Sequence, residues 1–341
     1  MADESKPMVV RIPRKAVAAK PAQALQVSAT PKRVSPPFSI PQVEPYEIQS
    51  QGPQPPDDAE MHLYTASSQS LSLKNMYKGS HGFLILSGPS LKNYDLSKLN
   101  GSRGIVTMGV NNSWSIFKPN LWISLDEPHY FLDAGWRDPS ITKFVPLAFS
   151  NKNIGIKKID GTFEKTTTKV NDLPAVFYFK RNLKFRVNQF LTEPTVNWGS
   201  SDGDVDEIGH HGARNIILSA IKMMYYLGFR KVYLLGADFK MEHGKPMHAF
   251  SQHITPENIA GHNASYAIIN KRLTALAPVF AAADFQIFNC YKESMLTAFP
   301  YLSYEEAFQR ASEGFSGPLN VEGWSDQYKI ESSQKSLPAR K

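Results

Sequence analysis

The 341-residue chain contains a single cysteine and no apolar run of membrane-spanning length. One cysteine excludes a disulfide framework and any zinc site built from several thiolates, and it favours a reducing compartment. A membrane-spanning helix needs about 18 or more consecutive apolar residues, so none is expected. The first residues also lack the apolar stretch of a secretory signal. We therefore expect a cytoplasmic protein without a membrane span, either in a bacterial cell or, for a viral protein, in its host.

Basic residues and prolines are concentrated at the two ends of the chain. The net charge is +7, of which residues 1–40 contribute +5 and residues 329–341 contribute +3, leaving −1 between them. Eleven of the 24 prolines fall within residues 1–58, and such a segment cannot bury enough apolar surface to offset its chain entropy. We expect a disordered, Pro-rich basic arm over 1–60 and a flexible tail over 316–341. The arm is either a plain extension or a tether for nucleic acid or another partner.

Short apolar runs alternate with helical patterns between residues 78 and 315. Apolar runs bounded by turn residues are typical of buried parallel strands, and they predict strands at 83–86, 105–110, 121–125, 144–147, 176–179, 231–236 and 285–289. Helical spacing predicts a helix from Ile216 to Leu227 capped by Gly228, and further helices over 264–277 and 303–311. The Lys/Thr-rich segment before 176 is expected to form an exposed loop or hairpin. This alternation indicates an α/β fold, with a mostly parallel sheet flanked by helices.

Each predicted strand ends in small or polar residues, which is the arrangement that a nucleotide site needs at the carboxyl ends of parallel strands. Gly88-Pro89-Ser90 is a candidate phosphate or ribose loop, because glycine permits close backbone approach and free N–H groups bind anions. An ordinary strand-to-helix turn is the alternative. Asn111 and Asn112 could read a base or ribose through their amides, although asparagine is also common in turns. The other polar strand ends are Asp126, Gly236 with Asp238, and Asn289.

Histidines are numerous in the second half of the chain, and each offers a general base near neutral pH. The candidates are His210, His211, His243, His248, His253 and His262. Neither an H-E-x-x-H nor an H-x-H spacing occurs, so we assign no metal site. Asp202, Asp204 and Asp206 resemble half a calcium loop that lacks its later ligands, or an Asp-x-Asp pair for Mg²⁺ or Mn²⁺. An acidic surface loop is the alternative interpretation.

Five blocks resemble, in order, the bacterial sialyltransferases that have a Rossmann-like nucleotide domain. The first is Gly88-Pro89-Ser90-Leu91-Lys92-Asn93, a loop that is also similar in the related motility-accessory and archaeal pterin-pyrophosphokinase-like proteins. The second covers residues 227–239, with a helix end, a strand and a Gly-x-Asp. The remaining blocks are 248–250, 261–263 and 289–294. The resemblance implies a Rossmann-like fold for the domain over 78–315.

This resemblance implies a glycosyltransferase that moves a sugar from a nucleotide-sugar donor to an acceptor hydroxyl, with no metal or further cofactor. His262 matches the family's catalytic base. The family's two phosphate-binding tyrosines correspond here to Lys240 and His248, with one extra residue between them; a cation and an imidazole also stabilise a leaving phosphate, and they suit a diphosphate. The residues assigned to the nucleotide are Gly88, Pro89, Ser90, Asn111, Asn112, Asp126, Gly236, Asp238, Asn289 and Ser294.

Two other functions remain open at this point. A Mg-dependent pyrophosphokinase-like enzyme acting on a small hydroxymethyl substrate would use Asp126, Asp202 and Asp204 as acidic ligands. A non-enzymatic Rossmann-like assembly protein would dock a partner through its Pro-rich arm. For the transferase, modified DNA, a glycan, a flagellin-like protein and a small molecule fit equally as acceptors. The family resemblance also implies a homo-oligomer.

Overall fold

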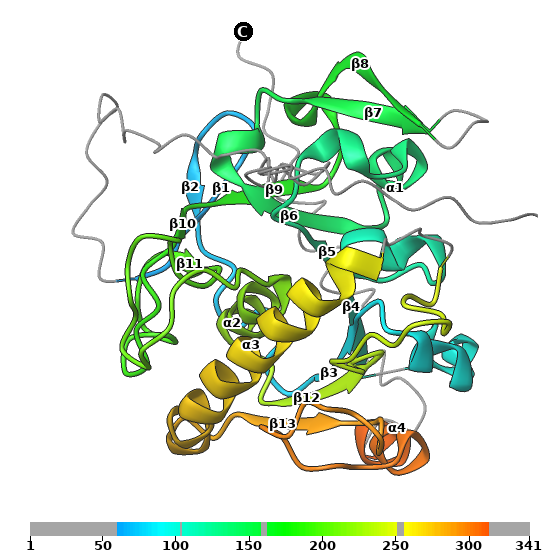
Figure 1. Ribbon diagram of the computed structural model, residues 1–341. Helices are drawn as coiled ribbons and strands as arrows, with labels where there is room; N and C mark the ends of the chain where they lie inside the picture. The colour runs from blue at the N-terminus through cyan, green and yellow to red at the C-terminus, as the bar shows by residue number, and fades with distance from the viewer. Residues whose placement is uncertain (1–59, 103, 158–161, 251–255, 314–341) are drawn as a thin grey trace, which may run out of the picture. The chain divides into compact units, whose positions relative to one another are not determined.

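The computed structural model of the chain describes residues 60–102, 104–157, 162–250 and 256–313 (Figure 1). The chain divides into two units, Met1–Gln54 and Pro55–Lys341, and every described residue belongs to the second. The predicted arm up to residue 59, the predicted tail over 316–341 and His253 lie outside the described residues. Within the described part of the chain, no helix has the length and apolarity that crossing a membrane requires.

A nine-stranded sheet forms the centre of the second unit, in the order β13-β12-β3-β4-β5-β6-β9-β1-β2. Its parallel strands are β3 (His81–Ile85), β4 (Ile105–Val110), β5 (Leu121–Ile123), β6 (Thr142–Pro146), β9 (Val176–Phe179), β12 (Lys231–Leu235) and β13 (Gln286–Asn289). The short strands β1 (Leu63–Tyr64) and β2 (Ser70–Leu71) extend one edge in antiparallel pairing. The predicted mostly parallel sheet is confirmed.

The order of strands along the sheet reverses between β3 and β12. From β3 the chain proceeds outward through β4, β5, β6 and β9, and it then returns to place β12 and β13 on the other side of β3. In open parallel sheets ligands bind beyond the carboxyl ends of the strands at such a reversal, because the loops there lead away in opposite directions. A ligand site is therefore expected at the loops that follow β3 and β12.

Side chains along each strand point alternately to the two faces of the sheet, so both faces carry apolar residues. Helices cover both of these faces. On one face Leu84, Met108 and Leu234 share a core with α2 (Ile216–Leu227) and α3 (Pro256–Ala282), and Figure 1 shows α3 crossing this face. On the other face Phe83 and Leu235 pack with α4 (Tyr304–Ser312) and with the 3₁₀ turns η1 (Pro89–Asn93) and η2 (Leu96–Leu99). The sheet is thus flanked by helices, as the sequence predicts.

The remaining elements lie in the connections between these strands. The Lys/Thr-rich segment forms the antiparallel hairpin of β7 (Asn153–Lys157) and β8 (Phe163–Lys169), which confirms the hairpin prediction. A separate pair, β10 (Arg181–Asn182) and β11 (Val196–Asn197), is parallel. The short helical segments are α1 (Asp133–Arg137), η3 (Asn111–Ser115), η4 (Pro128–Tyr130), η5 (Leu147–Phe149) and η6 (Val170–Asp172).

Two helices illustrate how local sequence sets the ends of elements. The Asn215 side chain accepts a hydrogen bond from the N–H of Ile217 at the start of α2, and Gly228 ends that helix with a φ of 104°, the left-handed conformation that glycine favours. For α3 the prediction was wrong at both ends, because the helix begins at Pro256 and continues past Pro278 to Ala282. Consequently His262 lies inside α3 rather than before it.

Candidate functional site

The loops after β3 and β12 are hydrogen-bonded to each other at the point where the strand order reverses. The N–H of Gly88 donates to the carbonyl of Gly236 at 2.9 Å. The Ser90 N–H donates to Asp238 Oδ1 at 3.1 Å, and the Ser90 hydroxyl donates to Asp238 Oδ2 at 2.6 Å. The structure therefore brings Gly88, Ser90, Gly236 and Asp238 together as predicted. It also shows that Ser90 and Asp238 bind each other and hold the two loops together.

Gly88 is required by the close approach of these two loops. A Cβ atom at this position would lie 2.0 Å from Oδ2 of Asp238 and 2.5 Å from the carbonyl oxygen of Gly236. The backbone of Gly88 has a φ of −64°, which any residue adopts, so the requirement is steric and not conformational. The sequence suggested that this glycine allows a ligand to approach. In the structure the neighbour that approaches it is the carboxylate of Asp238.

Asp238 is a buried carboxylate between these two loops, with only 5% of its surface exposed. Burial raises its pKa, whereas its hydrogen bonds from Ser90 and the nearby ammonium of Lys240 oppose that shift. The phenol of Tyr266, on α3, has a pKa raised to about 12 by burial, with the charge of Asp238 as a second cause. Tyr266 also contacts the ring of Phe239, at 5.1 Å between centroids. The N-terminal half of α3 therefore lies against the loop that follows β12.

The loop after β13 is attached to the loop after β12. Asn289 is buried and donates through Nδ2 to the carbonyl of Ala237 at 3.5 Å, and the Ser294 hydroxyl donates to the same carbonyl at 2.5 Å. The N–H of Met295 donates to the carbonyl of Asp238 at 3.0 Å. Asn289 and Ser294 thus attach their own loop to the backbone of the loop after β12. Their assignment to a nucleotide stays a prediction.

A second polar group lies at the ends of β4 and β5. Nδ2 of Asn111 donates to Asp126 Oδ2 at 3.1 Å, and Oδ1 of Asn111 accepts from the hydroxyl of Ser124 at 3.0 Å. Asn111 has a φ of 47°, the left-handed conformation that asparagine tolerates better than most residues. The side-chain amide of Asn111 is thereby used within the protein. Asn112 follows in η3, where its carbonyl accepts from the Ser115 hydroxyl at 2.7 Å.

Asp126 is the member of this second group that reaches solvent. The surrounding protein nevertheless raises its pKa, while the guanidinium of Arg181 and the amide of Asn111 oppose the shift. Arg181 itself donates to the carbonyl of Leu125 at 3.2 Å. Its guanidinium carbon lies 4.9 Å from the ring centroid of Trp198. An exposed carboxylate beside a fixed guanidinium can accept hydrogen bonds from the hydroxyls of a ligand.

His248 lies beside the loop that follows β3. The N–H of Ala249 donates to the carbonyl of Ser87 at 2.9 Å, which fixes the segment, and the imidazole stacks on Phe250 at 5.1 Å. Nδ1 of His248 is buried and has no hydrogen-bond partner of acceptable geometry among the described residues. Burial lowers the pKa of His248, and the nearby Ser87 carbonyl opposes the shift. The imidazole is therefore neutral near pH 7 and keeps one nitrogen without a partner.

His262 lies on α3 close enough to His248 to contribute to the lowering of its pKa. Its side chain is exposed, and its ring has no hydrogen bond to any described residue. Although solvent reaches the ring, the surrounding protein still lowers its pKa by desolvation. The neighbouring Asn263 holds α3 to the loop after β12, since its amide accepts from the N–H and donates to the carbonyl of Met241, both at 2.9 Å.

The sequence suggested that Lys240 binds a leaving phosphate, whereas in the structure Lys240 pairs with a carboxylate. Its ammonium lies 3.3 Å from Oε1 of Glu242, which also pairs with Lys245. Lys240 and Glu242 are both partly exposed, and exposed pairs of this kind contribute about 1 kcal/mol or less. A phosphate could therefore displace Glu242 from Lys240 at little cost.

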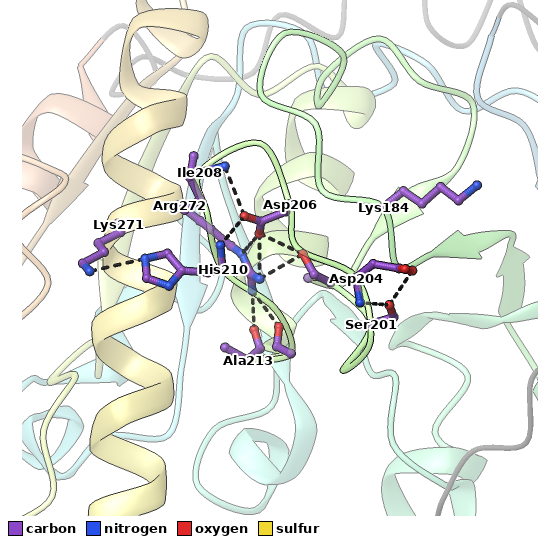
Figure 2. Close-up of polar contacts among 12 residues, drawn as sticks. Lys184, Ser201, Asp204, Asp206, Ile208, His210, Ala213, Lys271 and Arg272 are labelled. Atoms are coloured by element: carbon purple, nitrogen blue, oxygen red, sulfur yellow. Dashed lines mark hydrogen bonds and ion pairs between the residues drawn. The ribbon is translucent and has the colours of Figure 1, made fainter.

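The acidic loop of Asp202, Asp204 and Asp206 is organised by a buried arginine of α3, as Figure 2 shows. Arg272 is fully buried and pairs with Asp206, with 2.8 Å between Nη2 and Oδ2. It also donates to the carbonyls of Gly212 and Ala213, at 3.0 and 2.6 Å. The other oxygen of Asp206 accepts from the N–H groups of Ile208 and His210, at 3.1 and 3.0 Å.

The three carboxylates of this loop have separate partners. Asp204 accepts from the hydroxyl of Ser201 at 2.6 Å, and Asp202 accepts from Arg214 at 2.5 Å. Among the described residues, no group of three or more His, Cys, Asp and Glu side chains is placed to hold a metal ion. The loop therefore serves to attach the chain before α2 to α3, with Arg272 as its centre.

Two contributors to the site were missed in the sequence. Asn263 was part of a motif, but its role in joining α3 to the β12 loop depends on a contact with residue 241 that no local pattern indicates. Arg181 follows the predicted strand 176–179, and a cation just beyond the end of a strand is the feature that could have placed it near the site. The ten residues assigned to the nucleotide fall into two groups, one around Asp238 and one around Asn111.

Comparisons with known proteins add no family assignment. No protein-family model, no curated protein and no solved structure matches the chain. What the chain does must therefore be inferred from the geometry of the loops at the carboxyl ends of the strands.

Proposed function

We propose that the protein is a glycosyltransferase that binds a nucleotide-sugar in the crevice between the loops after β3 and β12, within a Rossmann-like domain. A reversal of strand order with polar loops at the carboxyl ends is the arrangement in which α/β proteins bind nucleotides. Asp238 and Ser90 give the crevice its shape. Asp126, held by Asn111 and close to Arg181, would accept hydrogen bonds from ribose hydroxyls.

The observation that carries the proposal is the placement of His262. Its imidazole is exposed, it has no hydrogen bond to any described residue, and desolvation lowers its pKa. A lowered pKa keeps the ring neutral near pH 7, and only a neutral imidazole can accept a proton. Asn263 holds this part of α3 to the β12 loop, which keeps the base beside the crevice.

In the proposed reaction His262 removes the proton of an acceptor hydroxyl as that oxygen bonds to the anomeric carbon of the donor sugar. The bond between the anomeric carbon and the phosphate oxygen breaks, and its electron pair leaves with the nucleotide. Lys240 would exchange Glu242 for the leaving phosphate, and the neutral His248 would donate one hydrogen bond to it. Such donors are effective because they stabilise the charge that develops on the leaving group.

Donor hydrolysis and transfer assays test this proposal. The wild-type chain should hydrolyse one of a panel of CMP-, UDP- and GDP-sugars, and it should do so in the presence of EDTA. His262→Ala should lower turnover by about a hundredfold or more, because a positioned general base contributes roughly that much. His243→Ala is the matched control, since His243 is an exposed histidine of the neighbouring loop.

Two outcomes would contradict the proposal. Undiminished turnover of the preferred donor by His262→Ala would remove His262 from the mechanism. Metal-dependent release of AMP from ATP, with no hydrolysis of any nucleotide-sugar, would favour the pyrophosphokinase-like alternative.

A further inference from the structure

Phe239, in the loop after β12, has a backbone conformation that residues of its kind rarely adopt. Its φ is 55°, in the left-handed region. A bulky aromatic residue is an outlier there, and such strain persists only where the surrounding structure imposes it. The other described residues besides glycine that have a positive φ are small or polar, namely Ser68, Asn75, Asn111, Ala175, Ala213 and Asp284. The loop therefore holds Phe239 against its own backbone preference.

Hydrogen bonds on both sides of Phe239 account for this conformation. On one side, the carboxylate of Asp238 accepts from the N–H and the hydroxyl of Ser90, at 3.1 and 2.6 Å. On the other side, the N–H of Met241 donates to the side chain of Asn263 and the Met241 carbonyl accepts from it, both at 2.9 Å. Only two residues separate these fixed positions. The backbone between them consequently has little freedom to relax.

With this backbone, the ring of Phe239 lies against Tyr266 of α3. The two ring centroids are 5.1 Å apart, and the planes are tilted by 33°. Both side chains are half-buried, and Phe239 also packs on the core that the sheet shares with α2 and α3. The ring contact therefore joins the loop to α3 at a second point, in addition to the hydrogen bonds of Asn263.

Tyr266 lies one helical turn after His262. A spacing of four residues puts the two side chains on the same face of α3. Helical side chains lean toward the N-terminus of their helix, so the ring of Tyr266 covers the turn that carries His262. The imidazole of His262 is exposed and has no hydrogen bond to any described residue. Its position is therefore set by this turn, which Asn263 fixes at one end and Tyr266 at the other.

We propose that Phe239 and Tyr266 are positioning residues, which hold the turn bearing His262 against the loop after β12 so that the imidazole meets the acceptor hydroxyl. This inference rests on the proposed function, because it takes His262 as the base. Neither ring needs to touch a substrate. A misplacement of a reacting group by about 1 Å can lower a rate by about a hundredfold, so a contact that orients the base has a large effect on turnover.

Histidine NMR titrations of the full chain separate this role from plain packing. Desolvation lowers the pKa of His262 below its ordinary value of 6.5, and its titratable neighbour His248 is also held below that value by burial. In Phe239→Ala and in Tyr266→Ala more water reaches the turn, so the pKa of His262 should rise toward 6.5. Tyr266→Phe keeps the ring and should keep the lowered pKa. Phe308→Ala is the matched control, because it removes a half-buried ring of α4 on the other face of the sheet.

Transfer kinetics provide a second measurement. With the donor that the wild type prefers, the two alanine variants should lower kcat about tenfold or more and leave the KM of the donor unchanged, because only the base is displaced. Tyr266→Phe should restore kcat. If an alanine variant does not fold, Phe239→Leu and Tyr266→Leu keep apolar bulk without the ring contact and should change kcat and the pKa of His262 in the same directions.

Two results would overturn the proposal. One is a pKa of His262 that is the same in the wild type and in every folded variant of Phe239 and Tyr266. The other is a loss of turnover that appears as a higher KM with kcat unchanged. If the wild type turns over no nucleotide-sugar, the proposed function fails, whereas the titrations still decide whether the two rings position His262.

Discussion

Replacing Gly88 with alanine tests whether the loops after β3 and β12 approach each other as closely as the structure shows. The new methyl carbon would lie 2.0 Å from Oδ2 of Asp238, 2.5 Å from the carbonyl oxygen of Gly236 and 2.7 Å from Cγ of Asp238. Two of these neighbours belong to a buried side chain that is already fixed by Ser90, and the third is backbone. Because the φ of Gly88 is −64°, alanine meets no backbone strain, and the entire effect comes from crowding.

The expected loss of stability has two parts. Forcing an extra methyl group into a packed site costs about 1–3 kcal/mol. Displacing Asp238 also weakens its two bonds from Ser90, and a hydrogen bond to a charged group contributes about 1.5–3 kcal/mol. Since relaxation preserves part of these bonds, we expect the free energy of unfolding to fall by about 2–4 kcal/mol, a large share of the roughly 5–15 kcal/mol typical of a domain.

Urea unfolding of Gly88→Ala, Asp238→Ala and the double variant measures this effect. In the Asp238→Ala background two of the three close contacts are absent, so alanine at 88 should cost less there, with a coupling of about 1 kcal/mol or more. Gly203→Ala is the matched control, because a Cβ at Gly203 meets no atom within 4 Å. The reasoning is refuted if Gly88→Ala is as stable as the wild type, or if the two substitutions are additive.

Three further predictions concern the surroundings of the crevice. Burial lowers the pKa of His248 below its ordinary value of 6.5. The contribution of the neutral imidazole to stability is therefore present above about pH 6.5 and is lost as pH falls through the folded-state pKa. Between pH 8 and 5 the urea midpoint of His248→Gln should fall less steeply than that of the wild type. Arg272→Met leaves Asp206 buried without its partner and should cost about 3–5 kcal/mol, whereas Lys271→Met should stay within about 0.5 kcal/mol. Asn263→Ala removes two bonds to backbone and should cost about 1–3 kcal/mol in thermal or urea unfolding.

The strands of the sheet were predictable because each is a short apolar run bounded by turn residues. The strands predicted at 105–110 and 176–179 have the same bounds as β4 and β9, and the others differ from the structure by a few residues. The helix predicted over 264–277 stops one residue before Pro278, whereas α3 continues through this proline to Ala282. In the structure Leu276 and Phe280 are buried on either side of it, and their packing outweighs the bond that proline removes. At the other end, Pro256 lies in the first turn of α3, a position where proline commonly marks the start of a helix.

The proximity of the loops after β3 and β12 was predictable, whereas the contacts between them were not. Polar strand ends in a parallel sheet must lie along one edge, so Ser90 and Asp238 were expected to be neighbours. Their direct bond joins residues 148 positions apart, and no local pattern distinguishes a serine that binds a ligand from one that binds an aspartate. Arg272 lies beside Leu273 and is fully buried on α3, and its buried partner Asp206 was not predicted from the sequence.

Amide and imidazole NMR spectra of the chain titrated with CMP, UDP and GDP test the central claim most directly. One nucleotide should shift the amides of the loops 87–91 and 236–239 together with the ring signals of His262. The proposed nucleotide site is wrong if none of the three nucleotides binds, or if the shifted signals lie away from both loops and from His262.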